Sequence, residues 1–135
     1  MKRLYKIAEE NDIPIIDMKM NGKEEAISHT FDNFCIIAID PRKVKSAADL
    51  KVKSAHELGH CLTGSFYNAD CPVVPRGRCE RRATVWAVKN TVSLRRLRTA
   101  MRNGATEVWE LAEYFGVTEE FMVEALKIYD MWNGG

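Results

Sequence analysis

The sequence predicts an α+β domain in which a small antiparallel sheet comes first and helices follow. Two observations carry this prediction. Runs of β-prone residues separated by turn residues are confined to residues 1–45, whereas the remainder shows helical periodicity with capping residues at the matching positions. At 135 residues and without repeats or a linker, the chain fits one domain. We expect that domain to cover residues 1–135, with a strand-rich part, two central helices and a C-terminal helical part at residues 1–45, 46–90 and 93–132.

The N-terminal part is expected to contain a helix and then strands. Apolar residues on one face predict a short helix over residues 2–10. The β-prone runs that follow cover residues 13–20, 24–30 and 34–39. Asn21-Gly22 between the first two runs is typical of a hairpin turn, so we expect antiparallel pairing.

The rest of the chain is expected to be helical. The first long helix should cover residues 47–66, and two prolines and a glycine predict a loop over residues 68–77. Ser93 is the expected N-cap of a helix that ends before Asn103-Gly104. The other helices are predicted over residues 78–90, after an N-cap at Thr106 and after an N-cap at Thr118.

Composition places the chain among ordinary globular proteins. It is 46% hydrophobic and 29% charged, and its apolar runs are too short to span a bilayer, so we expect no membrane segment. The N-terminus has no apolar stretch typical of an export signal, which favours a cytoplasmic location. In that reducing compartment we expect free thiols at all four cysteines, Cys35, Cys61, Cys71 and Cys79.

The most specific pattern is His56-Glu57-Leu58-Gly59-His60, an instance of His-Glu-x-x-His inside a predicted helix. Residues four apart lie on one face of a helix, so the two imidazoles can converge on one cation. Glu57 points about 100° away from His56 around the helix, which suits a base better than a ligand. Neutral imidazoles favour Zn²⁺, which lowers the pKa of a water molecule to about 7 for attack on a carbonyl. The pattern therefore predicts a hydrolytic zinc site with Glu57 as catalytic base.

A third ligand is needed, and spacing favours Glu80. It lies on the next predicted helix, where Ala83 and Ala87 follow on the same face and allow close approach of the two helices. A third histidine in an extended pattern is excluded, because residue 66 is phenylalanine. The alternatives that stay open at this point are Asp70, Cys71, Cys79 and His29.

These segments resemble the ImmA/IrrE family of metallo-endopeptidases. The matching stretches are Ser-Ala-His-Glu-Leu-Gly-His at residues 54–60 and Glu-Arg-Arg-Ala-Thr-Val-Trp-Ala at residues 80–87. The resemblance implies a zincin-like core with the gluzincin-type ligand set of His56, His60 and Glu80, and Glu57 as base. It also implies a cytoplasmic enzyme of bacteria, phage or other mobile elements, which cleaves helix-turn-helix repressors.

Residues 108–126 look like a helix-turn-helix themselves, with Gly116 at the turn. The second helix carries Glu119, Glu120 and Glu124, which would repel DNA phosphates, so we expect no direct binding of nucleic acid. The apolar stripe is typical of a packed helical hairpin. An acidic hairpin could alternatively dock on the basic face of a repressor.

Two main functional hypotheses follow. The first is a zinc endopeptidase whose protein substrate is a helix-turn-helix repressor. The second is a non-catalytic module that binds the repressor, with structural zinc or none. Glu57 discriminates between them, because it is essential for hydrolysis and dispensable for binding.

Overall fold

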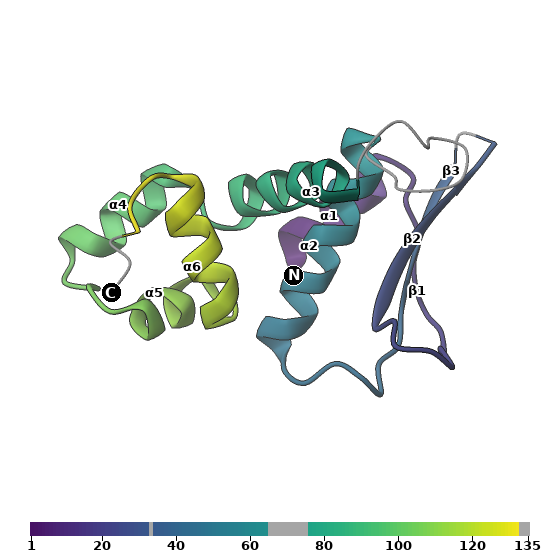
Figure 1. The fold of residues 1–135 in the computed structure, drawn as a ribbon, viewed down its shortest axis with the longest axis horizontal. Coiled ribbons are helices and arrows are strands. Elements are labelled where there is room, and N and C mark those ends of the chain that lie inside the picture. The colour runs from purple at the N-terminus through teal and green to yellow at the C-terminus, as the bar shows by residue number, and fades with distance from the viewer. Residues whose placement is uncertain (33, 65–75, 133–135) are drawn as a thin grey trace.

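The structure is a computed structural model that describes residues 1–32, 34–64 and 76–132. The predicted α+β class is confirmed (Figure 1). The elements, in chain order, are α1 (Lys2–Glu10), β1 (Ile15–Asp17), β2 (Ala26–Phe31), β3 (Phe34–Ile39), α2 (Ala47–Thr63), α3 (Arg76–Thr91), α4 (Leu94–Arg102), α5 (Val108–Phe115) and α6 (Glu119–Ile128). Most of the predicted loop at 68–77 lies outside the described residues.

The sheet has the strand order β1-β3-β2. Strands β2 and β3 pair antiparallel, with Ala26 opposite Ile39, as the sequence predicts. Strand β1 instead runs parallel to β3, with Ile15 opposite Ile37. The expected hairpin around Asn21-Gly22 is therefore wrong, because β1 and β2 lie on opposite sides of β3.

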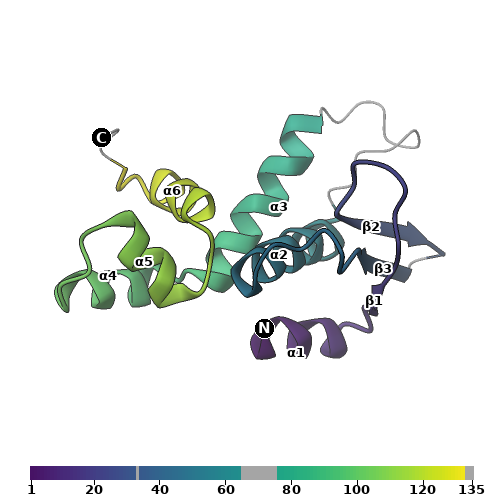
Figure 2. The ribbon, with the colours of Figure 1, turned by 90° about the horizontal axis from the view of Figure 1, so that it is seen from below.

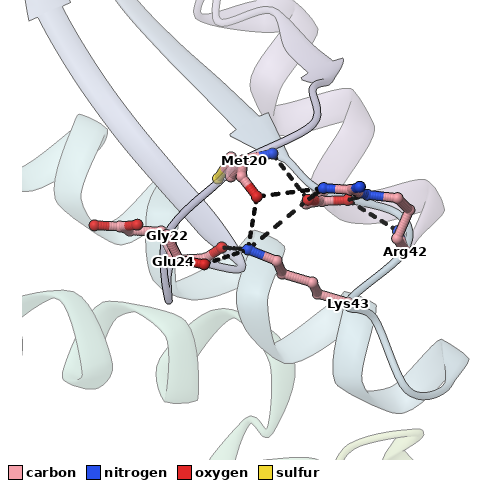
Figure 3. Close-up of polar contacts among 6 residues, drawn as sticks. Met20, Gly22, Glu24, Arg42 and Lys43 are labelled. Carbon is pink, nitrogen blue, oxygen red and sulfur yellow. Dashed lines mark hydrogen bonds and ion pairs between the residues drawn. The ribbon is translucent and has the colours of Figure 1, made fainter.

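The connection between β1 and β2 is held by a polar cluster at the end of β3 (Figure 3). The buried carboxylate of Asp40 accepts hydrogen bonds from the backbone N–H of Met20 at 2.9 Å and from the guanidinium of Arg42 at 2.8 Å. The Lys43 ammonium donates to the backbone carbonyls of Met20, Gly22 and Glu24. These contacts lead the chain across the end of β3 and override the local hairpin signal.

Helix α2 is capped at both ends. The Ser46 hydroxyl accepts a hydrogen bond from the Asp49 N–H at 3.0 Å, which satisfies one of the free donors of the first turn. Gly64 ends the helix with a φ of 64°, a left-handed conformation that glycine adopts at little cost. The helix therefore ends at Thr63, three residues earlier than the predicted end at residue 66.

The caps of the C-terminal helices agree with the sequence at two of three positions. Ser93 and Thr118 accept hydrogen bonds from backbone N–H groups at the starts of α4 and α6. At α5 the N-cap is Glu107, not Thr106, because Glu107 and Glu110 form a capping box. Gly116 follows α5 in a left-handed conformation, at the predicted turn of the hairpin.

Helix α2 lies at the centre of the molecule, between the sheet and the C-terminal helices α4 to α6 (Figures 1 and 2). It packs on β2 and β3 of the sheet and on the helices α1 and α3. Helices α4 to α6 gather at the end far from the sheet, and α6 returns to contact α3. Buried apolar side chains of both ends belong to one core, among them Leu4, Ile37, Leu58, Leu97 and Met122.

The expectation of free thiols throughout is wrong for two cysteines. Cys35 of β3 and Cys61 of α2 form a disulfide, because the packing of the strand on the helix brings their Cα atoms to 5.9 Å. Cys79 is a free, buried thiol, and Cys71 lies outside the described residues. The prediction missed this bond because it rested on the reducing compartment alone, where disulfides are rare.

Among the helices that the structure describes, none combines the length and the apolar character needed to cross a bilayer.

Candidate metal centre

Helix α2 presents both histidines of the His-Glu-x-x-His pattern on one face. The ring centroids of His56 and His60 are 4.8 Å apart, and the ring planes are nearly perpendicular. His60 is buried, with 8% of its side chain exposed, whereas His56 is about one quarter exposed. One ring is thus anchored in the protein interior, and the other lies at its boundary with solvent.

Glu80, in the first turns of α3, brings its carboxylate between the two rings. Its Oε2 lies 2.6 Å from Nε2 of His56, and its Oε1 lies 3.2 Å from Nε2 of His60. The side chain is 45% exposed, so the group is open to solvent on the carboxylate side. The structure brings together the three residues that spacing and resemblance selected.

The two helices approach so closely because the contact has almost no side chains in it. A Cβ atom on Gly59 would lie 2.5 Å from the carbonyl oxygen of Ala83 and 2.9 Å from its Cα, so only glycine fits. Ala83 and Ala87 are fully buried on the facing side of α3, as predicted. Gly59 is one of the variable positions of the pattern, and its part in this contact was not foreseen.

Glu57 lies next to His56 on α2, and its side chain lines a cleft together with His56. Burial raises the pKa of its carboxyl group above the usual range, while a hydrogen bond with Ser28 and the nearby imidazoles partly offset that shift. Ser28 belongs to β2, so the sheet supplies the hydrogen-bond partner of this carboxylate. Sequence reasoning missed Ser28, because no pattern within the helix indicates which strand residue will face Glu57.

A cleft of about 530 Å³ adjoins the site. Its walls come from the segment before β2 and from α2, α3 and α6. Lys53 in this cleft is paired with Glu25 at 2.8 Å. The residues lining the cleft are Lys23, Glu25, Ala26, Val52, Lys53, His56, Glu57, Thr84, Thr118, Glu120, Phe121 and Glu124. Two residues of the pattern, His56 and Glu57, therefore face this cleft.

The three side chains fit a divalent metal ion. One ligand atom from each of His56, His60 and Glu80 can be chosen such that all three lie within 4.8 Å of one another. Two imidazole nitrogens and a carboxylate oxygen are a donor set that transition metals such as zinc accept. Among the described residues, this is the one group of three or more potential ligands that lie so close together.

A comparison with protein families agrees with the resemblance seen in the sequence. The family model for the IrrE N-terminal-like domain, peptidase family M78, matches residues 8–127. The chain belongs to the M78 peptidase family. The resemblance to ImmA/IrrE proteins is thereby confirmed, and a metallopeptidase type of function is supported. No curated protein sequence matches the chain.

The alternative ligands lie elsewhere in this M78 domain or outside the described part of it. His29 is on the solvent side of β2, beside Phe31, and Cys79 is buried within α3. Neither belongs to the group around Glu80. Asp70 and Cys71 fall within residues 65–75, which the structure does not describe.

Proposed function

We propose that this M78 family member is a zinc-dependent endopeptidase that hydrolyses a peptide bond in a protein substrate, and that the substrate is a helix-turn-helix repressor. The observation that carries the proposal is the convergence of His56, His60 and Glu80 beside a cleft that also contains Glu57. A site of this composition matches the chemistry of metal-assisted hydrolysis.

Each residue has a distinct part in this reaction. His56, His60 and Glu80 would hold the metal. Zinc, when bound, supplies a Lewis acid that polarises the scissile carbonyl and lowers the pKa of water. Glu57 accepts the proton of the attacking water and delivers it to the leaving amine nitrogen. Its side chain lines the same cleft as His56, which is the position that this role requires.

The charges of the cleft support a basic protein as the substrate. Glu120 and Glu124 of α6 line it, and its four glutamates outnumber its two lysines, Lys23 and Lys53. Lys53 is also paired with Glu25 and Asp49. Repressors that bind DNA carry lysine and arginine on the face that contacts phosphates. An acidic wall attracts such a face and orients it over the site. A repressor substrate also implies that the protein acts in the cytoplasm.

The second candidate is a repressor-binding module that does not cut. It shares the cleft and the acidic wall with the first candidate, and zinc is then structural or absent. The position of Glu57 in the cleft, beside the metal-binding candidates, favours hydrolysis, because binding alone gives no role to a carboxylate at that position.

The substitution Glu57→Gln tests the proposal, since it keeps the shape of the side chain and removes its basicity. Zinc-loaded wild type and variant are incubated with a library of peptides derived from a bacterial proteome, and new N-termini are quantified by mass spectrometry. We expect cleavage to fall about a hundredfold to ten-thousandfold, the usual contribution of a general base. The control Glu9→Gln, on an exposed part of α1, should cleave like wild type.

The outcomes separate the two candidates. Cleavage by the Glu57→Gln variant at the wild-type rate excludes Glu57 as the base. If the wild type binds zinc and a helix-turn-helix repressor yet cuts neither the library nor the repressor, the non-catalytic module is the correct function.

A further inference from the structure

Helix α3 contacts His56 at two points. Thr84 follows Glu80 by four residues, so both side chains lie on one face of the helix, about one turn apart. The Thr84 hydroxyl oxygen lies 3.4 Å from Nδ1 of His56, while the Glu80 carboxylate lies 2.6 Å from Nε2 of the same ring. Both ring nitrogens of His56 therefore have a polar partner on α3.

The contact of Thr84 differs from those of other helical threonines in the chain. The hydroxyls of Thr91 and Thr99 donate to the backbone carbonyl four residues earlier in their own helices, at 2.6 Å and 3.1 Å. That bond is the common local choice for threonine in a helix. Thr84 instead makes its hydrogen bond across the interface between α3 and α2.

The chemistry of imidazole explains why a hydroxyl suits this position. When Nε2 of neutral His56 donates its proton to Glu80, Nδ1 carries a lone pair and accepts the Thr84 O–H. A metal bound through Nε2 requires the proton on Nδ1, which then donates to the hydroxyl oxygen. A hydroxyl can be donor or acceptor, so it has a hydrogen bond to offer in both states.

We propose that Thr84 is a positioning residue of the metal site, which holds the His56 ring in one orientation through the tautomer change that metal binding demands. The inference rests on the proposed metal site of His56, His60 and Glu80. It adds a fourth residue, which does not contact the ion itself and sets the affinity for it. Partners of this kind orient the histidine ring and fix its tautomer.

The test compares two substitutions at this position. Thr84→Val keeps the branched shape of the side chain and removes the hydroxyl, whereas Thr84→Ser keeps the hydroxyl. Zinc affinity is measured by competition with a chromophoric chelator. We expect Thr84→Val to weaken zinc binding about 10-fold to 100-fold, the usual effect of losing such a partner, and Thr84→Ser to bind as wild type does. Thr99→Val is the matched control, because Thr99 is exposed and its hydroxyl bonds to the backbone of its own helix.

Cobalt(II) substitution gives a second readout. The visible absorption bands of bound cobalt report the arrangement of its ligands, so Thr84→Val should change them and Thr84→Ser should not. Equal zinc affinity of wild type and Thr84→Val overturns the inference, and so does an equal loss in Thr84→Val and Thr84→Ser. A wild-type protein that binds no zinc overturns the ligand set of the proposed function as well, which distinguishes the two failures.

Discussion

Asp40 shows how one buried charge holds a long connection in place. Its side chain is fully buried, and its two oxygens accept hydrogen bonds from the Arg42 side chain and from the backbone of Met20 and Arg42. The Arg42 guanidinium and these N–H groups hold the pKa of the carboxyl well below its usual range. Ionisation of Asp40 is thereby coupled to the path of the chain between β1 and β2.

The stability of the protein should depend on pH through this residue. Because the pKa is lower in the folded state than the value of about 3.9 expected when unfolded, the stabilisation is complete above that value and is lost as pH falls below it. Asp40→Asn should lower the free energy of unfolding near neutral pH and flatten its decline in acid. Urea unfolding at neutral pH and at about pH 3 gives the free energy of unfolding under both conditions, and so measures both effects.

The exposed strand residue Asp17 provides the control, since Asp17→Asn should leave both quantities near those of wild type. An Asp40→Asn protein whose stability declines in acid as steeply as that of wild type would show that other carboxyl groups dominate.

The contact between α2 and α3 is the element on which the candidate metal centre depends. His56 and His60 come from one helix and Glu80 from the other, and Gly59 lets the backbones meet at Ala83. The atoms that a new side chain would strike belong to the backbone of Ala83, which cannot move aside by rotating a bond. Gly59 therefore determines how closely α2 and α3 approach each other.

Gly59→Ala should destabilise the protein by about 1–3 kcal/mol, because overpacking outweighs the gain in helix propensity. It should also weaken zinc binding, since it moves Glu80 away from the histidines. Chemical denaturation and chelator competition measure the two effects. Gly77→Ala, also in α3 but with open space around it, should be neutral or stabilising by about 0.5–1 kcal/mol. Equal stability of Gly59→Ala and wild type would contradict the close contact.

Local sequence patterns predicted the helices and most of their caps. They did not predict contacts between residues far apart in sequence. Ser93 and Thr118 begin helices as predicted, because their hydroxyls act within four residues along the chain. The parallel pairing of β1 escaped prediction, since it depends on Asp40 contacting a residue 20 positions away. The site divides in the same manner. Helix spacing selects His56, His60 and Glu57, whereas Ser28 and Thr84 reach the site from other elements.

At the scale of the whole molecule, the candidate metal centre joins parts that are far apart in sequence. Helix α2 packs on the sheet, and α3 packs on α6, so the ligands connect the strand-rich end with the C-terminal helices. A ligand that binds the folded state alone stabilises it in proportion to the logarithm of its concentration over the dissociation constant. Zinc should therefore stabilise the entire fold.

The melting temperature measures this linkage. Free zinc at a hundredfold excess over the dissociation constant should add about 2.7 kcal/mol to the stability of wild type, and a chelator should remove that gain. Glu80→Gln should abolish most of the increase, while the exposed Glu113→Gln should retain it. A melting temperature that rises equally in Glu80→Gln and wild type would place the bound zinc elsewhere.

The bond between Cys35 and Cys61 closes a covalent ring, with the two cysteines 26 positions apart in sequence. Both histidines of the metal centre belong to this ring, as does the capped start of α2. A single backbone nick by a protease anywhere inside the ring leaves the two pieces joined through sulfur. Such a nicked chain travels as one band on a denaturing gel until a thiol reductant separates it into two.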